Sequence, residues 1–420
     1  METYKYSKGP ALMARAEKVI PKGIYGHLGA TYLIPNEAYP LFSERTQGAY
    51  FWDVDGNKFL DYMCGFGPNI LGYNDPDVDA AVMEQMKKEN CSTKPTEKLI
   101  ELAELMVDTV DMADWAMFCK NGGDVTSLAL LIARAATGRR KVILVKGSYH
   151  GVSPWMQSPG PGHGGIGPED LTDNIYVDWN NADQVEQAIR DNPGQIACFM
   201  STPYWHPVSV DNQMPADGYW QKIRNLCTSN GIVLTIDDVR CGFRMDAAGS
   251  DKYFGFKADL MCFCKSLANG WTISALCGAD ALKDAAKSVF YTGSYWLAAV
   301  PFAAATACIS KIKRVNAVQH MKGIGEKFTK GLVEVAKSHG HKLVASGHPS
   351  MFFIRHVMED QQTALPFHRA FIAECVKRGV YLTSFHNMFT CYAMTDKDVE
   401  FSLAVADEAY RELAKNFKVN

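Results

Sequence analysis

The sequence predicts an α/β protein built on a large, doubly wound and mostly parallel sheet, with a smaller α+β domain at the C-terminal end. Short, continuous apolar runs are typical of strands buried on both faces of such a sheet. These runs are residues 141–146, 196–200, 232–236 and 260–263. Amphipathic helical patterns separate them, at residues 125–136, 183–190 and 218–229. Strands alternating with helices indicate a parallel sheet, whose ligands bind beyond the carboxyl ends of the strands.

Other patterns flank this central region. An extended run at 350–356, a helix near 365–378, a strand at 380–383 and a closing helix after Asp396 predict the small lobe. In the first sixty residues, aromatic-rich strands surround the hairpin signal Asp55-Gly56. We therefore expect three parts along the chain. They are an N-terminal segment 1–60 packing with the small domain, a large domain 61–310 and a small domain 311–420.

Composition excludes several classes of protein. Hydrophobic residues make up 47% of the 420 residues and charged residues 21%, and 43 Lys+Arg against 46 Asp+Glu give a net charge of −3. A disordered chain and a basic nucleic-acid-binding surface are therefore not expected. The longest nearly apolar run, residues 296–309, is interrupted by Pro301 and is shorter than the roughly 20 residues of a membrane span. We expect neither a nucleic acid nor a membrane as a partner.

The compartment is expected to be the cytoplasm. The first eight residues carry charge and contain no apolar stretch of the kind that a signal peptide needs. Twelve cysteines in so long a chain are too sparse for a disulfide framework, so free thiols are expected. No Cys-x-x-Cys occurs, and the eleven histidines form no zinc-like set, so no metal site is predicted.

Two charged residues follow predicted buried strands. Asp237 ends the run 232–236, where a carboxylate is either a helix cap or the acidic partner of a bound ligand. Lys265 follows the run 260–263. Because burial disfavours an ammonium group, such a lysine is either ion-paired or kept near neutrality as a nucleophile able to form a Schiff base.

Two further motifs are predicted at the same edge of the sheet. In Asn121-Gly122-Gly123-Asp124 the glycines let main-chain N–H groups approach a phosphate at the start of the helix near Val125, although a glycine pair is more often a simple turn. Tyr149 and His150 follow the run 141–146 and offer an aromatic face, or ordinary packing. A lysine, a phosphate cradle, an aromatic face and a carboxylate together are what pyridoxal 5'-phosphate requires.

The order of these motifs resembles the class III pyridoxal phosphate aminotransferases, especially the branch that contains glutamate-1-semialdehyde aminomutase. The resemblance covers nearly the whole chain. The segments that carry it are Ala16–Gly23, Gly48–Asn57, Gly67–Gly72, Asp237–Arg244 and the Lys265 segment. It implies a fold type I enzyme in which pyridoxal 5'-phosphate is the cofactor.

The resemblance also implies roles for individual residues. Lys265 would form the Schiff base and move the proton, Asp237 would pair with the pyridinium nitrogen, and Val239 would pack on the ring face opposite Tyr149. Gly122, Gly123 and Asp124 would hold the phosphate, with the Asp124 carboxylate turned away from it. His150 belongs to the same cofactor site. In such enzymes a Gly-Thr pair from the neighbouring subunit completes the phosphate site, and Gly293-Ser294 is similar to it. The resemblance therefore implies a homodimer with shared active sites.

The expected substrate pocket departs from that of the aminomutases. The N-terminal Ser and Arg region of the family corresponds to Tyr25–Gly29, which holds no arginine, and the family's C-terminal acidic residue falls near His386. His27 and His386 are predicted to line a remodelled pocket, with buried structural histidines as the alternative. Arg240 is predicted either to grip an acidic group of the substrate or to form a structural salt bridge.

Transamination between a small amine or amino acid and a carbonyl acceptor is the function we expect. A lyase, racemase or aminomutase on the same scaffold is the alternative, because one carbanion can lead to each outcome. A cofactor-free binding protein is a third hypothesis, and it predicts a colourless preparation.

Overall fold

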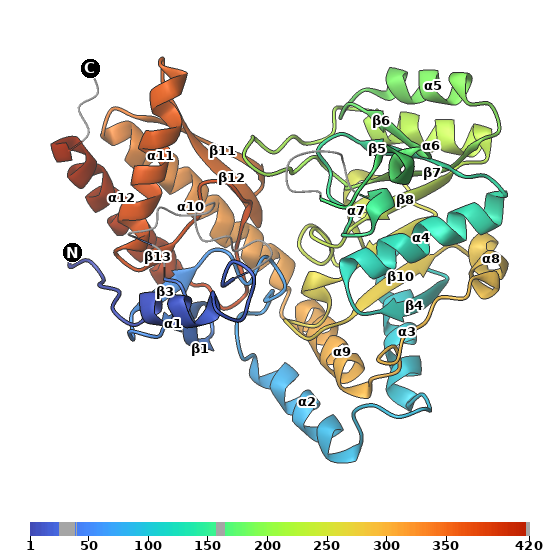
Figure 1. The fold of residues 1–420 in the computed structure, drawn as a ribbon, viewed down its shortest axis with the longest axis horizontal. Coiled ribbons are helices and arrows are strands. Elements are labelled where there is room, and N and C mark those ends of the chain that lie inside the picture. Colours follow the sequence, from blue (N-terminus) through green and yellow to red (C-terminus); the bar gives the residue numbers. More distant parts are fainter. Residues whose placement is uncertain (25–37, 39, 157–163, 417–420) are drawn as a thin grey trace. The chain divides into compact units, whose positions relative to one another are not determined.

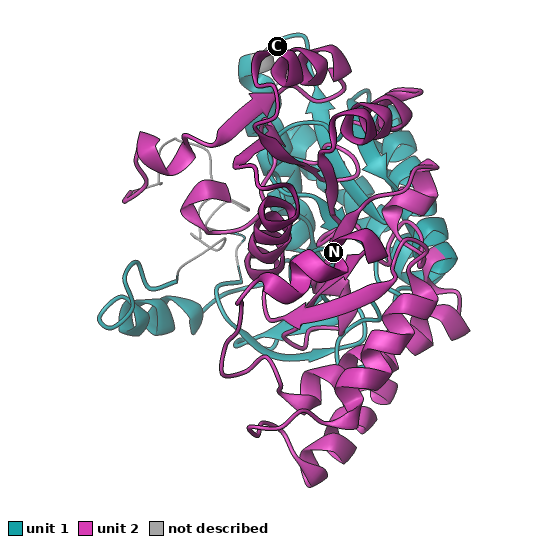
Figure 2. Cartoon of the chain, turned by 90° about the vertical axis from the view of Figure 1, so that its right-hand side faces the viewer, with its two compact units in different colours: residues 1–75, 207–212, 319–420 teal, residues 76–206, 213–318 magenta. Residues whose placement is uncertain are grey.

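The chain forms two compact units. The computed structural model describes residues 1–24, 38, 40–156 and 164–416. One unit, unit 1, comprises Met1–Asp75, Pro207–Asn212 and Gln319–Asn420, and the other, unit 2, comprises Pro76–His206 and Gln213–Val318 (Figure 2). The N-terminal residues thus share a unit with the C-terminal hundred, and the large unit begins at Pro76.

Unit 2 contains a seven-stranded sheet in the order β4-β10-β9-β8-β7-β5-β6. Its strands are β4 (Trp115–Cys119), β5 (Lys141–Val145), β6 (Asn174–Val177), β7 (Ile196–Ser201), β8 (Val233–Asp237), β9 (Leu260–Phe263) and β10 (Ser274–Gly278). Neighbours from β6 to β9 run parallel, whereas β10 is antiparallel to both β9 and β4. The four apolar runs of the sequence are thus the parallel strands β5, β7, β8 and β9, and the mostly parallel α/β fold is confirmed.

The helices of unit 2 connect these strands, cover the sheet or, like α2 and α9, pack against each other (Figure 1). They are α2 (Pro76–Lys88), α3 (Glu97–Thr109), α4 (Gly122–Thr137), α5 (Ala182–Asp191), α6 (Tyr219–Asn230), α7 (Ser250–Phe254), α8 (Lys283–Ser288) and α9 (Ala299–Arg314). The central helix α4 contacts β4 and β7 to β10, and it ends at Gly138, whose φ of 68° places it in the left-handed region that favours glycine. Three 3-10 turns, Pro154–Met156, Pro168–Leu171 and Asp280–Leu282, lie in the connections, and a fourth, Lys265–Leu267, follows β9.

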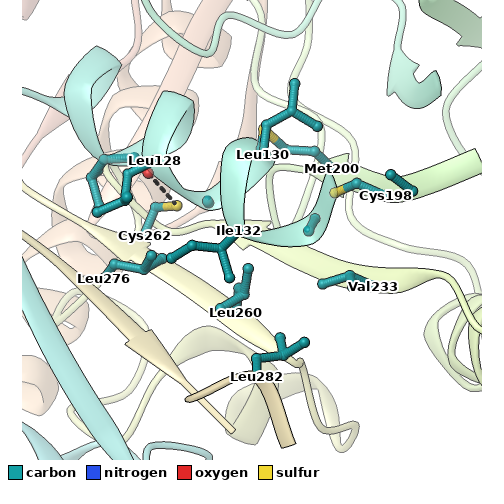
Figure 3. Packing of buried hydrophobic residues seen from close by; sticks show 14 of the residues in the cluster. Leu128, Leu130, Ile132, Cys198, Met200, Val233, Leu260, Cys262, Leu276 and Leu282 are labelled. Carbon is teal, nitrogen blue, oxygen red and sulfur yellow. Dashed lines mark hydrogen bonds between the residues drawn. The ribbon is translucent and has the colours of Figure 1, made fainter. Parts of the chain in front are cut away.

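The core of unit 2 lies between α4 and the sheet. Leu128 and Ile132 of α4 belong to one buried cluster with residues of six strands, and Figure 3 shows them beside Met200, Leu260 and Leu276. Cys262 donates its thiol proton to the Val125 carbonyl at 3.7 Å within this cluster. The packing holds the start of α4 against the strands that end beside it.

Unit 1 contains two small sheets. One has the order β1-β2-β3-β13, with β1 (Ser43–Gln47), β2 (Tyr50–Asp53), β3 (Lys58–Asp61) and β13 (Val380–Tyr381). The hairpin expected at Asp55-Gly56 joins β2 to β3, which pair antiparallel, while β13 pairs parallel with β3. The other sheet is β11 (Lys342–His348), β12 (Met351–Val357) and β14 (Met388–Phe389). The helices are α1 (Gly9–Ala16), α10 (Ala317–Ser338), α11 (Gln361–Val376) and α12 (Asp396–Asn416).

Among the helices of the described residues, none is both long enough and apolar enough to cross a bilayer.

Candidate active site

The carboxylate of Asp237 lies at the end of β8 and is held from two sides. It is 4% exposed, and His150, 3% exposed, places Nδ1 2.7 Å from Asp237 Oδ2. The main-chain N–H of Val239 donates to the other oxygen, Oδ1, at 3.1 Å. These two contacts hold the buried Asp237 carboxylate in one orientation, and it does not cap a helix.

The glycines of the expected phosphate cradle lie inside α4. The helix begins at Gly122, not near Val125 as expected, because Asn121 and Asp124 form a capping box that starts it earlier. The main-chain N–H of Asn121 donates to Asp124 Oδ2 at 2.8 Å. The Asp124 carboxylate thus points back along the chain and satisfies N–H groups of the helix start, in agreement with the expected orientation. Asn121, the cap, was not among the predicted cofactor residues.

The start of α4 touches the loops that follow β5 and β8. A Cβ on Gly122 would lie 2.9 Å from Cγ1 of Val239, and a Cβ on Gly151 would lie 2.5 Å from the Cα of Gly123. Thr126, one turn further along α4, donates its hydroxyl to the His150 carbonyl at 2.5 Å. The start of α4, the loop that contains His150 and the loop that follows Asp237 are therefore closely packed. Only glycine fits at positions 122 and 151, where these segments meet. Thr126 was missed because a hydroxyl inside an apolar helix gives no signal of its long-range partner.

Lys265 begins the turn after β9, and β9 pairs with β8 so that Cys262 is the partner of Asp237. Burial and the positive charge of Arg240 together lower the pKa of Lys265 to about 8. The negative charge of Asp237 opposes the shift. An amine in this environment is deprotonated far more often at neutral pH than a surface lysine, which is what a nucleophile needs.

Tyr149 and Arg240 both lie close enough to Asp237 to interact with its charge. The Tyr149 side chain is 52% exposed; burial raises the pKa of its phenol, and the charge of Arg240 lowers it. The Arg240 Nη1 atom donates to the His206 carbonyl at 3.1 Å and lies 3.1 Å from Nδ1 of its ring. His206, which sequence reasoning missed, therefore orients this guanidinium.

Three further residues were predicted for the site: Ser294, His386 and His27. Ser294 is exposed in unit 2, where its carbonyl accepts the Cys91 thiol at 3.6 Å. His386 belongs to unit 1, is 5% exposed and directs Nδ1 to the Asn387 carbonyl at 2.8 Å. His27 lies outside the described residues. Within unit 2, the structure thus brings together the predicted cofactor residues other than Ser294.

The donor set fits pyridoxal 5'-phosphate. Gly122 and Gly123 stand in the first turn of a sixteen-residue helix, where free N–H groups and the helix dipole favour an anion. Asp237 offers a carboxylate, Lys265 an amine of lowered pKa, and Tyr149 a half-exposed side chain with an aromatic ring. Within the described residues, three or more His, Cys, Asp or Glu side chains nowhere gather as a metal site would require.

Comparison with known proteins places the chain in a family. The model of the family described as aminotransferase class III matches residues 33–159 and 173–417, which is most of the chain. This chain belongs to the class III aminotransferases. Its function is therefore transfer of amino groups, and its cofactor is pyridoxal 5'-phosphate.

Individual proteins are similar to this class III enzyme over nearly its whole length. It is 39% identical over 409 residues to an aminopentol aminotransferase of Sphingopyxis macrogoltabida, covering 97% of this chain and 94% of that one. It is 28% identical over 428 residues to a glutamate-1-semialdehyde 2,1-aminomutase of Alkaliphilus oremlandii (strain OhILAs), covering 97% and 99%. The solved structure of the FumI protein of Sphingopyxis sp. MTA144, in its PLP internal aldimine form, matches with a TM-score of 0.93 at 38% identity and covers 97% of each chain. The class III aminotransferase has the fold type I architecture that the sequence predicts.

Proposed function

We propose that Lys265 is the residue through which this aminotransferase acts, and that it moves an amino group between a small amine or amino acid and a carbonyl acceptor. When bound, the cofactor supplies an aldehyde that reacts with amines and a ring that accepts electrons. The observation that carries the proposal is the lowered pKa of Lys265 beside the fixed carboxylate of Asp237. The Lys265 Nζ atom would hold the cofactor through its aldehyde group and would carry the proton removed from the substrate carbon.

The other residues of the group would hold and tune the cofactor. The N–H groups of Gly122 and Gly123 would bind the phosphate, and the Asp237 carboxylate would keep the pyridine nitrogen protonated by raising its pKa. Val239, which packs against Gly122, and the exposed ring of Tyr149 would contact the two faces of the cofactor ring. His150 would act as a positioning residue by orienting Asp237.

A homodimer with shared sites is part of the proposal. Ser294 is exposed, and its segment carries two large exposed side chains, Phe290 at 92% and Tyr295 at 67%. Exposed apolar side chains of this size are typical of an interface. Ser294 of the partner subunit would then contribute a hydroxyl to the phosphate, and sedimentation of the holoenzyme should give the mass of two chains.

Substrate residues and compartment are also proposed. Arg240, His27 and His386 remain the predicted substrate residues, and the substitution of both histidines should alter the substrate profile. The twelve cysteines are free thiols, which supports a reducing compartment such as the cytoplasm.

Replacing Lys265 with Ala tests the central proposal. The variant, reconstituted with cofactor, should lose the visible absorption of the wild-type enzyme and at least about 10³-fold in turnover. Wild-type enzyme mixed with an amine and no carbonyl acceptor should convert its cofactor to the pyridoxamine form without releasing ammonia catalytically. Retention of both absorption and turnover in Lys265→Ala would refute the role, and catalytic ammonia would indicate a lyase.

A further inference from the structure

A six-residue segment of the chain leaves unit 2 and returns to it. This segment, Pro207–Asn212, belongs to unit 1, whereas His206 before it and Gln213 after it belong to unit 2. At its base the main-chain N–H groups of Trp205 and Gln213 each donate to the other's carbonyl, at 3.0 and 2.8 Å. Pro207–Asn212, the tether, is thus closed at both ends by unit 2, and it is joined to His206 covalently.

Asn212 anchors the tether in unit 1. Its side chain is 6% exposed, its main-chain N–H donates to Ser346 Oγ at 3.0 Å, and its Oδ1 atom accepts the Asn387 amide at 2.6 Å. A Cβ on Gly347, whose φ is 89°, would lie 2.4 Å from Asn212 Nδ2, so the asparagine occupies space that only a glycine leaves open. Because a buried amide without these partners is costly, the anchor is held in one place.

Two further contacts within unit 1 hold the middle of the tether. Asp211 accepts two N–H groups of Arg355 in the bidentate arrangement, from Nε at 2.8 Å and from Nη2 at 2.6 Å. The main-chain N–H of Ser209 donates to the Phe385 carbonyl at 2.8 Å. Ser209 has a φ of 70°, which a residue other than glycine keeps only where surrounding contacts impose it. The tether therefore has little freedom to move independently of unit 1.

His206 connects the tether to Arg240. It is 7% exposed, and Pro207 restricts its main chain. Nη1 of Arg240 donates to the His206 carbonyl at 3.1 Å and lies 3.1 Å from His206 Nδ1. Because a guanidinium only donates, Nδ1 must accept, and the ring proton is on Nε2, which lies 3.4 Å from Cys241 Sγ. The ring is thus fixed between a donor and a weak acceptor, and the guanidinium follows its position.

Arg240 is one of the charges that set the reactivity of Lys265. Burial is the main cause of the lowered pKa of Lys265, and the positive charge of Arg240 is the next. The charge of Arg244 lowers this pKa as well, whereas that of Asp237 opposes the shift. Since the interaction of two charges weakens as they move apart, a displaced Arg240 guanidinium would leave the amine more basic.

We propose that the tether sets the position of Arg240 relative to Lys265, with Asn212 as its anchor in unit 1 and His206 as the residue that holds the guanidinium. Asn212 and His206 act as positioning residues and take no part in proton transfer. The inference rests on the proposed function in one respect, because it takes Lys265 as the reacting amine. It makes the readiness of Lys265 to react depend on unit 1 as well as on unit 2.

Labelling of Lys265 with acetic anhydride in the full-length apoenzyme, over a range of pH, tests the inference without turnover. Arg240→Gln should raise the midpoint of labelling by about one pH unit. His206→Phe should cause most of that rise, and Asn212→Ala a smaller one. His206→Asn, whose Oδ1 atom can replace Nδ1 as acceptor, should restore the wild-type midpoint. Val208→Thr changes an exposed side chain of the tether and is the matched control, with no expected shift.

Double variants separate positioning from general damage to the fold. In an Arg240→Gln background, His206→Phe and Asn212→Ala should cause no further rise, because the charge that they displace is already absent. A further rise of equal size in that background would overturn the inference. Wild-type midpoints in both single variants would overturn it too.

A second anchor variant covers the case in which Asn212→Ala does not fold. Arg355→Gln removes the bidentate contact to Asp211 and should raise the midpoint in the same direction, again only when Arg240 is present. A wild-type midpoint in Arg355→Gln, with Asn212→Ala unfolded, would overturn the role of the anchor. Retained turnover in Lys265→Ala would overturn the proposed function instead, whereas the labelling results would stand because they require no turnover.

Discussion

His150 Nδ1 lies 2.7 Å from Asp237 Oδ2, although His150 follows β5 and Asp237 is the last residue of β8. Because a carboxylate has no proton to donate, the Nδ1–H group of His150 is the donor. The second oxygen of Asp237 accepts the Val239 N–H, so both oxygens are engaged and the side chain is fixed. A buried carboxylate held in this way needs no reorganisation when it meets a cationic ring nitrogen, and this is the condition for electrostatic stabilisation.

Substitution of Asp237 should therefore harm catalysis more than folding. Asp237→Asn keeps the shape and removes the charge, and it should lower kcat by about 10²- to 10³-fold. His150→Phe removes the donor and leaves the carboxylate intact, so its loss of kcat should be about tenfold. Steady-state kinetics of both variants, each with saturating cofactor, would measure the difference.

His150→Gln is the matched control for this pair, because its amide can still donate to the carboxylate. It should recover most of the kcat lost in His150→Phe. If Gln and Phe were equally damaging, or if His150→Phe were as inactive as Asp237→Asn, a positioning role for His150 would be contradicted.

The amine of Lys265 should titrate according to the charges around it. Its pKa is lowered to about 8 by burial and by Arg240, while Asp237 acts in the opposite direction. In apoenzyme, Arg240→Gln should raise this pKa because it removes a neighbouring positive charge, and Asp237→Asn should lower it because it removes a negative one. Competitive labelling with acetic anhydride over pH 6 to 11, read by mass spectrometry of the Lys265 peptide, reports the shift. Lys283 serves as the exposed reference. Identical labelling profiles of Lys265 in wild type, Arg240→Gln and Asp237→Asn would refute the role of these two charges in setting its pKa.

Gly151 is expected to be the least replaceable glycine of the site. Its φ of 124° is strained for any other residue, and a Cβ would lie 2.5 Å from the Cα of Gly123, a main-chain atom that cannot rotate away. Gly151→Ala should cost about 1–3 kcal/mol of stability and weaken cofactor binding, because the helix start must move. Gly164→Ala, where the added Cβ meets nothing within 4 Å, should stay within about 0.5 kcal/mol. Denaturant unfolding and cofactor titration would show whether the two variants differ.

Much of the large sheet and of the site could be predicted from the sequence because buried parallel strands leave continuous apolar runs. The run 232–236 located Asp237, and the run 260–263 located Lys265, since a charge that follows such a run stands at the carboxyl edge of the sheet. The resemblance of the motifs to a known family then supplied the roles. Both steps rest on signals that lie within a few residues of each side chain.

Contacts between distant segments could not be predicted in this way. The hydroxyl of Thr126 binds the His150 carbonyl across 24 residues of sequence, and His206 holds Arg240 across 34. Neither partner carries a local pattern that distinguishes it from packing residues. The start of α4 was misplaced for a related reason, since the glycines suggested a loop while the capping box of Asn121 and Asp124 stabilises a helix there.

A buried histidine pair in unit 1 predicts how stability depends on pH. His356 of β12 and His368 of α11 face each other with their Nδ1 atoms 2.9 Å apart, and His356 Nε2 lies 2.7 Å from the Tyr410 hydroxyl of α12. Burial lowers the pKa of His368 to about 4, and burial together with the neighbouring His368 and His341 lowers that of His356. The unfolded chain therefore binds more protons than the folded one between pH 6.5 and 4, so stability is fully present above pH 6.5 and falls as the pH drops through this window.

For His368 alone the loss at pH 4 is about 3 kcal/mol. His368→Gln cannot take up this proton, so the stability difference between wild type and variant should narrow as the pH falls from 7 to 4.5. Thermal unfolding across that range gives the difference, and hydrogen exchange of peptides from α11 and α12 assigns it to unit 1. A difference that stays constant with pH would mean that His368 is not kept neutral by the fold.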